Sequence, residues 1–338
     1  MSSLIVDRRG VHLALDGNAI VIREDEERVA TIPIQPLSRV FLKGDVSVSA
    51  NLLGKLGEAG VGVIILAGRR GKPALMLARP HNDARRRVAQ ILKAFDEPFA
   101  LEFSRALVHR KCEGQRFFLL ELRQRYPGVR LELTHAIRQI EKAAVDAQSA
   151  QSIAALRGIE GHAARYYFSG LKAVVPDSWG FHGRNRRPPR DPFNALLSLT
   201  YTLMHAEIAL SLFGAGFDPF VGFYHALSFG RESLASDLLE PLRVVCDRFC
   251  LELIRNETVR KEHFSQTESG CLLGKAGRQH FYGAYEHAGN DLRSAIEQEV
   301  EWLSDWLKAA EEPLAAAEEA WEAFASASDS LAASDPLE

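Results

Sequence analysis

The sequence predicts an α+β fold, with a small N-terminal β-rich domain followed by a larger all-α domain. Up to about residue 80, apolar and polar side chains alternate, as in LIVDRRGVHLALDGNAIVIRE, and this period of two is typical of strands. From about Asn82 onward, apolar side chains recur with the 3.6-residue period of amphipathic helices. The length of 338 residues also favours two domains over a single core.

The β-rich domain is predicted over residues 1–80. Turn signals at Arg9-Gly10 and Asp16-Gly17-Asn18 separate its first strands. Pro33 and Pro36 confine the next segments to sheet edges or turns. The segment SANLLGKLGEAG has helical spacing, and VGVIILAG and PALMLA are predicted as further strands.

The helical domain is predicted over residues 81–310. Its helices are expected as two within 83–126, two within 133–171, and one each within 194–216, 234–254 and 290–310. A loop rich in Pro, Gly and Arg is predicted over 173–191. The acidic tail, residues 311–338, is rich in Ala, Glu and Ser and is predicted to be disordered.

The composition is that of an ordinary soluble globular protein, with 46% hydrophobic and 25% charged residues. The sequence predicts no membrane association, because we identify no apolar run near the roughly 20 residues that a span needs. The N-terminus lacks the apolar core of a secretory signal, so the cytoplasm is the expected compartment. Four scattered cysteines are too few for a disulfide framework and are predicted to be buried and reduced.

The net charge of −3 conceals a basic body. Eight of the 44 acidic residues follow Ala309, and none of the 41 basic residues does, so basic residues outnumber acidic ones in the rest of the chain. Arginine clusters suit phosphate, since the planar guanidinium binds oxyanions through two N–H groups. Three clusters together favour nucleic acid over solvated charged faces. They are 69–72, 85–87 and the loop carrying Arg184, Arg186, Arg187 and Arg190.

One constellation of acids and a histidine could carry chemistry. Asp237 and Glu240 lie three residues apart on a predicted helix, so both could face one ligand. His225 lies upstream of them, and Ser233 is a plausible N-cap of that helix. Two carboxylates and one imidazole suit Mg²⁺ or Mn²⁺. Acid pairs at this spacing are also common on exposed helices, so the pair alone is a weak signal. Glycine-rich phosphate loops, zinc-protease motifs and nucleophile elbows are absent from the sequence.

The same stretch resembles a signature of the CRISPR-associated adaptation integrase family. The shared pattern is Gly222-Phe223-x-His225, then Ser233-Leu234-x-x-Asp237-Leu238-x-Glu240-x-x-Arg243. Two further segments are similar: Asn194-Ala195-Leu196-Leu197-Ser198 with Tyr201, and Gly158-Ile159-Glu160-Gly161 with Tyr166-Tyr167-Phe168. The similarity extends over about residues 3–305, including the N-terminal β segment, and the ordered combination is specific where each piece alone is not.

The resemblance implies a divalent metal, Mg²⁺ or Mn²⁺, bound by Glu160, His225 and Glu240, with Asp237 as an auxiliary ligand or a structural residue. These ligands would support transesterification, in which a DNA 3′-hydroxyl attacks a phosphodiester of the CRISPR repeat. Arg231 and Arg243 are candidates for phosphate contacts, with salt bridges to neighbouring acids as the alternative. The implied partners are double-stranded DNA (fragment and repeat), a second copy in a homodimer, and a small second CRISPR adaptation protein.

Two alternatives stay open from the sequence. The chain could be a metal-dependent nuclease or a transposon-type integrase that does not act on CRISPR repeats. It could also be a non-catalytic DNA-binding scaffold, although such a scaffold has no physical need for three converging ligands.

Overall fold

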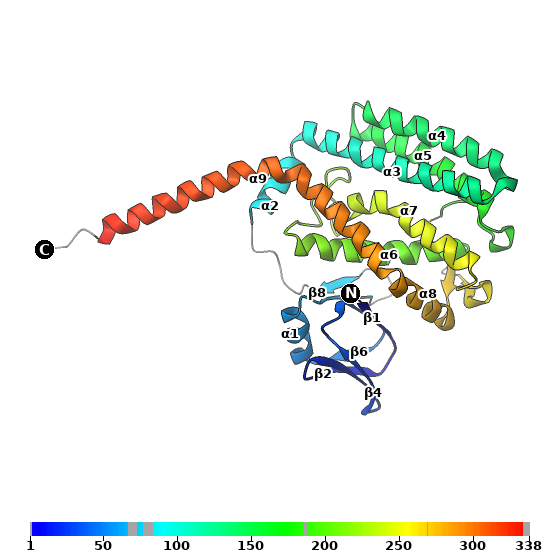
Figure 1. The fold of residues 1–338 in the computed structure, drawn as a ribbon, viewed down its shortest axis with the longest axis horizontal. Helices are drawn as coiled ribbons and strands as arrows, with labels where there is room; N and C mark the ends of the chain where they lie inside the picture. Colours follow the sequence, from blue (N-terminus) through cyan, green and yellow to red (C-terminus); the bar gives the residue numbers. More distant parts are fainter. Residues whose placement is uncertain (1, 67–72, 77–83, 186–187, 269, 334–338) are drawn as a thin grey trace.

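The computed structural model describes residues 2–66, 73–76, 84–185, 188–268 and 270–333. Figure 1 shows a strand-rich region at the N-terminus and a helical region packed above it, with the last helix extending away from both. This arrangement confirms the predicted α+β fold with an N-terminal β part.

The N-terminal region contains two four-stranded sheets. Their strands are β1 (Ser2–Asp7), β2 (Val11–Asp16), β3 (Ala19–Glu24), β4 (Glu27–Pro33), β5 (Leu37–Lys43), β6 (Val46–Val48), β7 (Gly62–Ile65) and β8 (Ala74–Met76). One sheet has the order β1-β5-β7-β8 and the other β4-β3-β2-β6. The predicted turn at Asp16-Gly17-Asn18 joins the antiparallel pair β2 and β3, and Gly17 adopts the positive φ of 59° that such a turn favours. β4, which ends at Pro33, is an edge strand as predicted.

A hydrophobic core joins the two sheets to the one helix that the described residues of this region form. Helix α1 (Ala50–Glu58) begins after Ser49, whose hydroxyl accepts the N–H of Leu52. Leu52 and Leu56 are buried against Leu13 and Ile20 of the β2–β3 hairpin and against strands of the other sheet. The alternation of the sequence therefore places one face of each sheet in the core.

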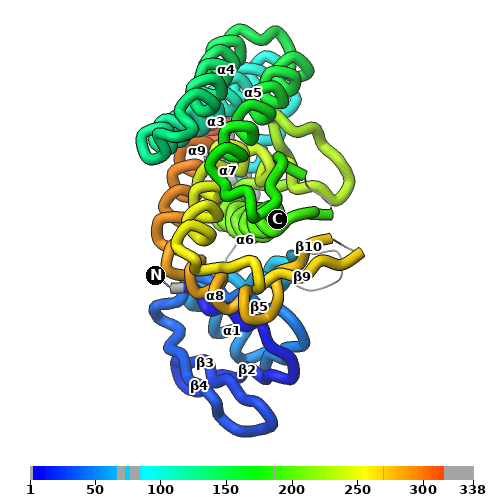
Figure 2. Tube along the Cα trace, turned by 90° about the vertical axis from the view of Figure 1, so that its right-hand side faces the viewer, coloured from blue at the N-terminus to red at the C-terminus, as the bar shows by residue number. Residues whose placement is uncertain are grey.

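Among the described residues, the helical region contains seven α-helices, a short hairpin, and an eighth α-helix that follows the hairpin. The helices are α2 (Arg85–Ala94), α3 (Glu97–Arg125), α4 (Arg130–Gln148), α5 (Ile153–Val174), α6 (Pro192–Gly214), α7 (Ser233–Arg255) and α9 (Gly289–Ala333). The hairpin of β9 (Phe264–Thr267) and β10 (Gly270–Leu273) leads into an additional helix, α8 (Lys275–His287). In the turned view of Figure 2, α3, α4 and α5 lie farthest from the sheets, and α6 lies between them and the β region.

Helix α6 is the central helix of the core. It is the one helix among the described residues that is long and apolar enough to cross a membrane, which differs from our finding no apolar run of that length in the sequence. About 67% of its most apolar window is buried within the protein, as in the core helix of a soluble protein. All four cysteines are free and buried, which confirms the prediction made for them.

The structure differs from the sequence predictions at three places. The β9–β10 hairpin and α8 were not predicted, because their strands are only four residues long and carry no clear alternation. Ser233 is the first residue of α7 and not its N-cap, since its hydroxyl donates to the carbonyl of Ala226 (3.0 Å). The tail was predicted to be disordered from residue 311, yet α9 continues to Ala333, because Ala and Glu are strong helix formers.

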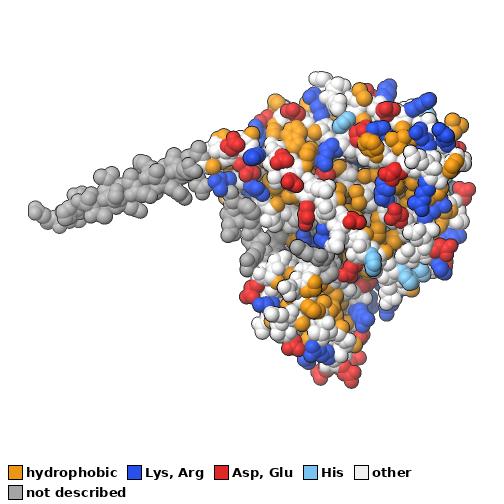
Figure 3. Space-filling model, in the orientation of Figure 1, with side chains coloured by type: hydrophobic (Ala, Val, Ile, Leu, Met, Phe, Trp, Pro, Cys, Tyr) orange, Lys and Arg blue, Asp and Glu red, His pale blue; other side chains and the backbone are white. Residues whose placement is uncertain are grey.

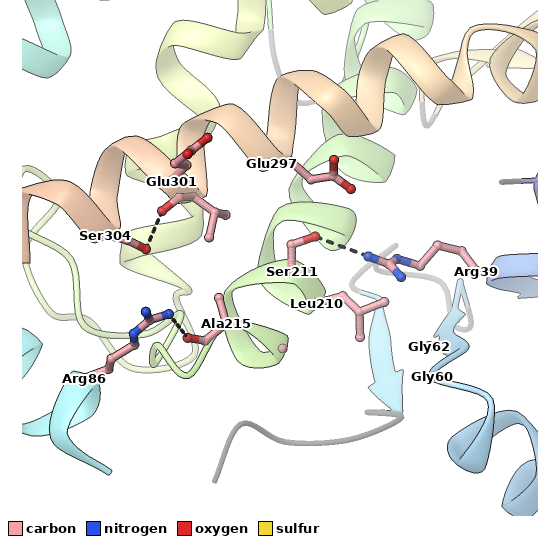
Figure 4. A pocket seen from close by; sticks show the side chains of 12 residues that line it. Arg39, Gly60, Gly62, Arg86, Leu210, Ser211, Ala215, Glu297, Glu301 and Ser304 are labelled. Atoms are coloured by element: carbon pink, nitrogen blue, oxygen red, sulfur yellow. Dashed lines mark hydrogen bonds between the residues drawn. The ribbon is translucent and has the colours of Figure 1, made fainter. Parts of the chain in front are cut away.

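A cavity of about 630 Å³ lies where the β region meets α6 and α9. Figure 4 shows Arg39 donating to Ser211 on one side of it and Arg86 donating to the carbonyl of Ala215 on the other. Glu297 and Glu301 of α9 also line the cavity. None of the predicted metal ligands lines this cavity, so it belongs to the junction between the two regions and not to the candidate site.

Candidate active site

The loop that carries His225 is fastened to α7 through Asp237. One oxygen of the Asp237 carboxylate accepts the backbone N–H groups of Phe223 (2.8 Å) and Tyr224 (3.0 Å). The other accepts the backbone N–H of His225 (2.9 Å) and lies 2.7 Å from the Nδ1 atom of its ring. Because a carboxylate only accepts, Nδ1 donates in this contact, and Nε2 is the ring nitrogen left to face a ligand. The local structure therefore prepares His225 as a ligand.

Gly222 allows this close approach. A Cβ atom at position 222 would lie 2.7 Å from Oδ2 of Asp237 and 2.8 Å from the backbone carbon of Ser233. Both distances are shorter than real Cβ contacts. Glycine at this position is therefore a steric requirement of the anchor between the loop and α7.

The two predicted glutamate ligands converge from different helices on one buried cation. The Lys111 ammonium on α3 donates to Oε1 of Glu160 on α5 and, at 2.5 Å, to Oε2 of Glu240 on α7. The side chains of Lys111 and Glu240 are 4% and 6% exposed, while that of Glu160 is 21% exposed. The site is therefore closed on the α3 side, whereas Glu160 is partly exposed to solvent, as is His225, whose side chain is 20% exposed.

Arg243 forms the second ion pair of Glu240. Its Nε and a terminal nitrogen donate to the two carboxylate oxygens at 2.9 and 3.0 Å. Burial opposes the charged form of Glu240, but Arg243 and Lys111 outweigh it and hold the pKa of Glu240 below its usual range. Burial lowers the pKa of Lys111, but Glu240 and Glu160 outweigh that effect and raise it. Glu240 and Lys111 therefore keep their charges at neutral pH.

A buried network lies behind Arg243. The guanidinium lies over the ring of Tyr201, 4.6 Å from the centroid. The hydroxyls of Tyr201 and Tyr167 both donate to Asp247, that of Tyr167 at 2.8 Å. Burial raises the pKa of Asp247 to about 6, against the hydrogen bonds from the two tyrosines. This network fixes the guanidinium that faces Glu240.

The predicted phosphate-binding arginines lie in different surroundings from one another. Arg243 is buried in its ion pair with Glu240, which favours the salt-bridge alternative, and Arg184 donates to Asn194 (2.8 Å) and Ser198 (3.2 Å) within the protein. Arg190 is exposed and Arg231 is partly buried. Arg186 and Arg187 lie outside the described residues, as do Arg69, Arg70 and Lys72 of another cluster. On the face that Figure 3 shows, basic and acidic side chains are interspersed.

Glu160, Glu240 and His225 supply the kinds of donor atom that Mg²⁺ and Mn²⁺ take, but in the described part of the chain no group of three His, Cys, Asp or Glu residues lies at metal-binding spacing. The Lys111 ammonium already occupies the position of a cation between the two carboxylates. The hydroxyl of Tyr224 is buried and has no hydrogen-bond partner among the described residues. Its pKa is raised first by burial and then by the charges of Glu160 and Glu240, so the ring lies within electrostatic reach of both. Glu160, Glu240 and Nε2 of His225 are the residues that would hold the metal.

Two residues of the site were missed by the sequence reading. Lys111 lies on the buried face of α3 together with Leu107, Val108 and Cys112. A charged residue at an apolar position of an amphipathic helix is the signal that could have identified it. The sequence gives no such signal for Tyr224, because an aromatic residue next to Phe223 is expected to belong to the hydrophobic core.

The fold and the site define a protein with an N-terminal β region and a helical region that contains a buried glutamate–histidine centre. The family model of the CRISPR associated protein Cas1 matches residues 4–287, and the chain belongs to this family. This confirms the resemblance found in the sequence.

Relatives in other organisms are similar over most of their length. A CRISPR-associated endonuclease Cas1 of Thermodesulfovibrio yellowstonii is 37% identical over 89% of this chain and 95% of its own. One of Thermus thermophilus is 34% identical, covering 83% of this chain and 82% of its own. Among solved structures, a Cas1 protein from Thermotoga maritima has a TM-score of 0.77 at 24% identity, covering 91% of this chain and 97% of its own. A casposase bound to an integration product also has a TM-score of 0.77, at 21% identity and 91% coverage of both chains, which shows a shared fold.

Proposed function

We propose that this chain is a metal-dependent DNA integrase and endonuclease of CRISPR adaptation, which inserts short DNA fragments into the repeat array. Membership of a family whose curated relatives are named endonucleases supports the nuclease class. The observation that carries the metal-dependent part is the convergence of Glu160 and Glu240 on a single cation position, together with an imidazole, His225, that Asp237 of the same helix as Glu240 holds in place. The proposed metal is Mg²⁺ or Mn²⁺, held by these three side chains.

The proposed reaction is a transesterification at phosphorus. The 3′-hydroxyl oxygen of the incoming fragment forms a bond to the phosphorus of a repeat phosphodiester, and the bond from that phosphorus to the 3′-oxygen of the repeat strand breaks. A proton leaves the attacking hydroxyl, and a proton from solvent joins the departing oxygen. With water as the nucleophile, the same exchange is hydrolysis. When bound, the divalent ion would supply charge stabilisation to the phosphoryl oxygens.

The chain's own residues prepare this site in three ways. Asp237 holds the His225 ring with Nε2 available, so little orientation entropy is lost on binding. Arg243 keeps Glu240 ionised and in one rotamer. The partial exposure of Glu160 leaves a side of the site open to a DNA strand. No nucleophilic side chain is needed, since the attacking group belongs to the substrate.

We further propose double-stranded DNA, a second copy of the chain and a small second adaptation protein as partners. Structures of similar fold include a Cas6-RT-Cas1--Cas2 complex, with a TM-score of 0.69 at 24% identity, covering 90% of this chain and 36% of that one. The casposase bound to its integration product provides a fold relative seen on DNA. These relatives motivate the choice of partners in the assay below.

The test is a strand-joining assay. Purified protein and its small partner are mixed with a fluorescent DNA fragment and a plasmid, with or without CRISPR repeats, in Mg²⁺, Mn²⁺ or EDTA. We expect joining at the repeat in either metal, none in EDTA, and none with Glu160→Gln or Glu240→Gln. Glu141→Gln, at an exposed position of α4, is the matched control and should join normally.

Three other outcomes decide between the alternatives. Cutting without joining would leave a nuclease. Joining that is equally frequent without repeats would favour a transposon-type integrase. No reaction in any metal would support a DNA-binding scaffold, and full activity of Glu240→Gln would show that the reaction does not use a metal held by Glu240. Either result would overturn the proposal.

A further inference from the structure

Lys111 is a charged side chain that neither the motifs nor the proposed reaction uses. It lies on α3, in a row of buried apolar residues, and is 4% exposed. Its ammonium bridges carboxylates from two other helices, Glu160 on α5 and Glu240 on α7. A single positive charge thus joins three helices at the centre of the candidate site.

Charge balance requires a cation at this point. Glu240 is buried and Glu160 is 21% exposed, and the two carboxylates would repel each other if the ammonium between them were removed, because burial weakens the screening of charge. Arg243 compensates Glu240, but no contact from it to Glu160 is seen. Lys111 is therefore the group that neutralises Glu160 and the second neutralising group for Glu240.

While the Lys111 ammonium lies between the two glutamates, no metal ion can be bound by both of them. Oε2 of Glu240 already lies 2.5 Å from Nζ of Lys111 and 2.9 Å from Nε of Arg243, and Oε1 is paired with Arg243. A Mg²⁺ ion approaches its oxygen ligands to about 2.1 Å. An ion bridging Glu160 and Glu240 would have to take the place of Nζ, since both groups need the same space and the same lone pairs.

We propose that Lys111 is an internal cation that competes with the divalent metal: its ammonium holds Glu160 and Glu240 together in the metal-free protein and is displaced when the metal binds. The inference rests on the proposed metal site and goes beyond it. Lys111 remains protonated throughout, and the exchange replaces one positive charge by two. The metal-free site thus stays folded, and metal affinity is lower than the three ligands alone would give.

The test is calorimetric titration of Mn²⁺ into the metal-free protein and its variants at constant pH and ionic strength. Lys111→Met removes the competing charge and keeps much of the side-chain volume. Lys111→Gln keeps a polar end and serves if the methionine variant folds poorly. Lys111→Arg keeps the charge, and Lys142→Met, at an exposed position of α4, is the control for removing a lysine elsewhere.

We expect Lys111→Met and Lys111→Gln to bind Mn²⁺ on the order of tenfold more tightly than the wild type. Lys111→Arg should bind no more tightly than the wild type, and Lys142→Met should match it. In EDTA, Lys111→Met should melt at a lower temperature than the wild type, and Mn²⁺ should raise its melting temperature by more than it raises that of the wild type.

The outcomes separate this inference from the proposed function. Unchanged or weaker Mn²⁺ binding by both neutral variants, with wild-type binding that depends on Glu160 and Glu240, would overturn the competition and leave the metal site intact. Mn²⁺ binding that persists in Glu240→Ala, or is absent from every protein including Lys111→Met, would overturn the metal site itself and the competition with it.

Discussion

Asp237 and Glu240 lie three residues apart on the same helix, yet their surroundings differ in kind. Asp237 is matched by fixed donors, three backbone N–H groups and one ring nitrogen of the neighbouring loop. Glu240 is matched by the side-chain cations of Lys111 and Arg243. Backbone donors cannot leave without unfolding the loop, whereas a side-chain ammonium can move.

This difference gives the two acids different roles in the site. Asp237 builds the site by fixing the loop and the ring of His225. Glu240 has partners that can be exchanged, and is therefore suited to bind an ion that arrives and departs. The sequence alone could not separate the two acids, because their spacing is equally consistent with two ligands.

The largest expected effect concerns His225, the proposed ligand that Asp237 holds in place. His225→Ala should lower DNA joining and cutting on the order of a thousandfold, because it removes a ligand from the metal that stabilises the developing charge. Initial rates in Mn²⁺ measure this. His162→Ala, at an exposed position of α5, is the matched control and should retain wild-type rates. Activity of His225→Ala within a few-fold of the wild type would remove His225 from the ligands.

The next largest effect concerns the hydrogen bonds by which Asp237 holds the loop that carries His225. Asp237→Ala should lower the free energy of unfolding by about 3 kcal/mol, since three backbone donors lose their acceptor in a buried site. Denaturant titration in EDTA measures it without any metal. Ser236→Ala, which removes the neighbouring hydroxyl and its bond to the Glu232 carbonyl, should cost much less. Equal losses for the two variants would show that Asp237 does not anchor the loop.

The pH dependence of stability should distinguish the buried carboxyls. Burial raises the pKa of Asp247 to about 6 from 3.8, so the folded state binds more protons than the unfolded state between these values. The contribution of Asp247 to stability is therefore present at low pH and falls by about 3 kcal/mol as pH rises through that window. Asp247→Asn should remove this loss.

Glu240 should show the opposite sign. Its pKa in the folded state is held below 4.5 by Arg243 and Lys111, so its stabilisation is present above pH 4.5 and is lost as the solution becomes more acidic. Unfolding curves from about pH 2 to pH 7 for the wild type, Asp247→Asn and Glu240→Gln cover both windows and give the two differences. Slopes of the same sign would contradict the assignment of charges.

The smallest effect concerns Gly222. Gly222→Ala places a methyl group 2.7 Å from Oδ2 of Asp237 and should destabilise the protein by about 2 kcal/mol. Gly161→Ala, on α5 with open space around its Cβ position, should be neutral or slightly stabilising. Denaturant titration compares them. Equal stabilities would mean that the loop and α7 separate easily.

Much of the fold could be predicted because it follows from local patterns. The alternation from residue 3 onward, the turn at Asp16-Gly17-Asn18 and the periodic apolar residues of the long helices each act over a few residues. The β9–β10 hairpin was not predicted, since strands of four residues show little alternation. The helical tail was not predicted, because an Ala/Glu-rich composition is consistent both with a disordered tail and with a helix.

The candidate site could be predicted only as far as its motif reaches. His225, Asp237 and Glu240 are close in sequence, and the family resemblance added Glu160. The contact of Lys111 with Glu160 and Glu240 joins positions 49 and 129 residues apart, so only the packing of α3 against α5 and α7 reveals it. The assignment of metal ligands stays a prediction, and the phosphate role of Arg243 competes with its ion pair.

The most direct test of the central claim is the anomalous diffraction of crystals grown with Mn²⁺. We predict one Mn²⁺ ion bonded to Glu160, Glu240 and Nε2 of His225, with Asp237 still bound to the loop and the Lys111 ammonium moved from between the glutamates. An ion bonded to Asp237 in place of Glu240, or no ion at this site at saturating Mn²⁺, would contradict the account.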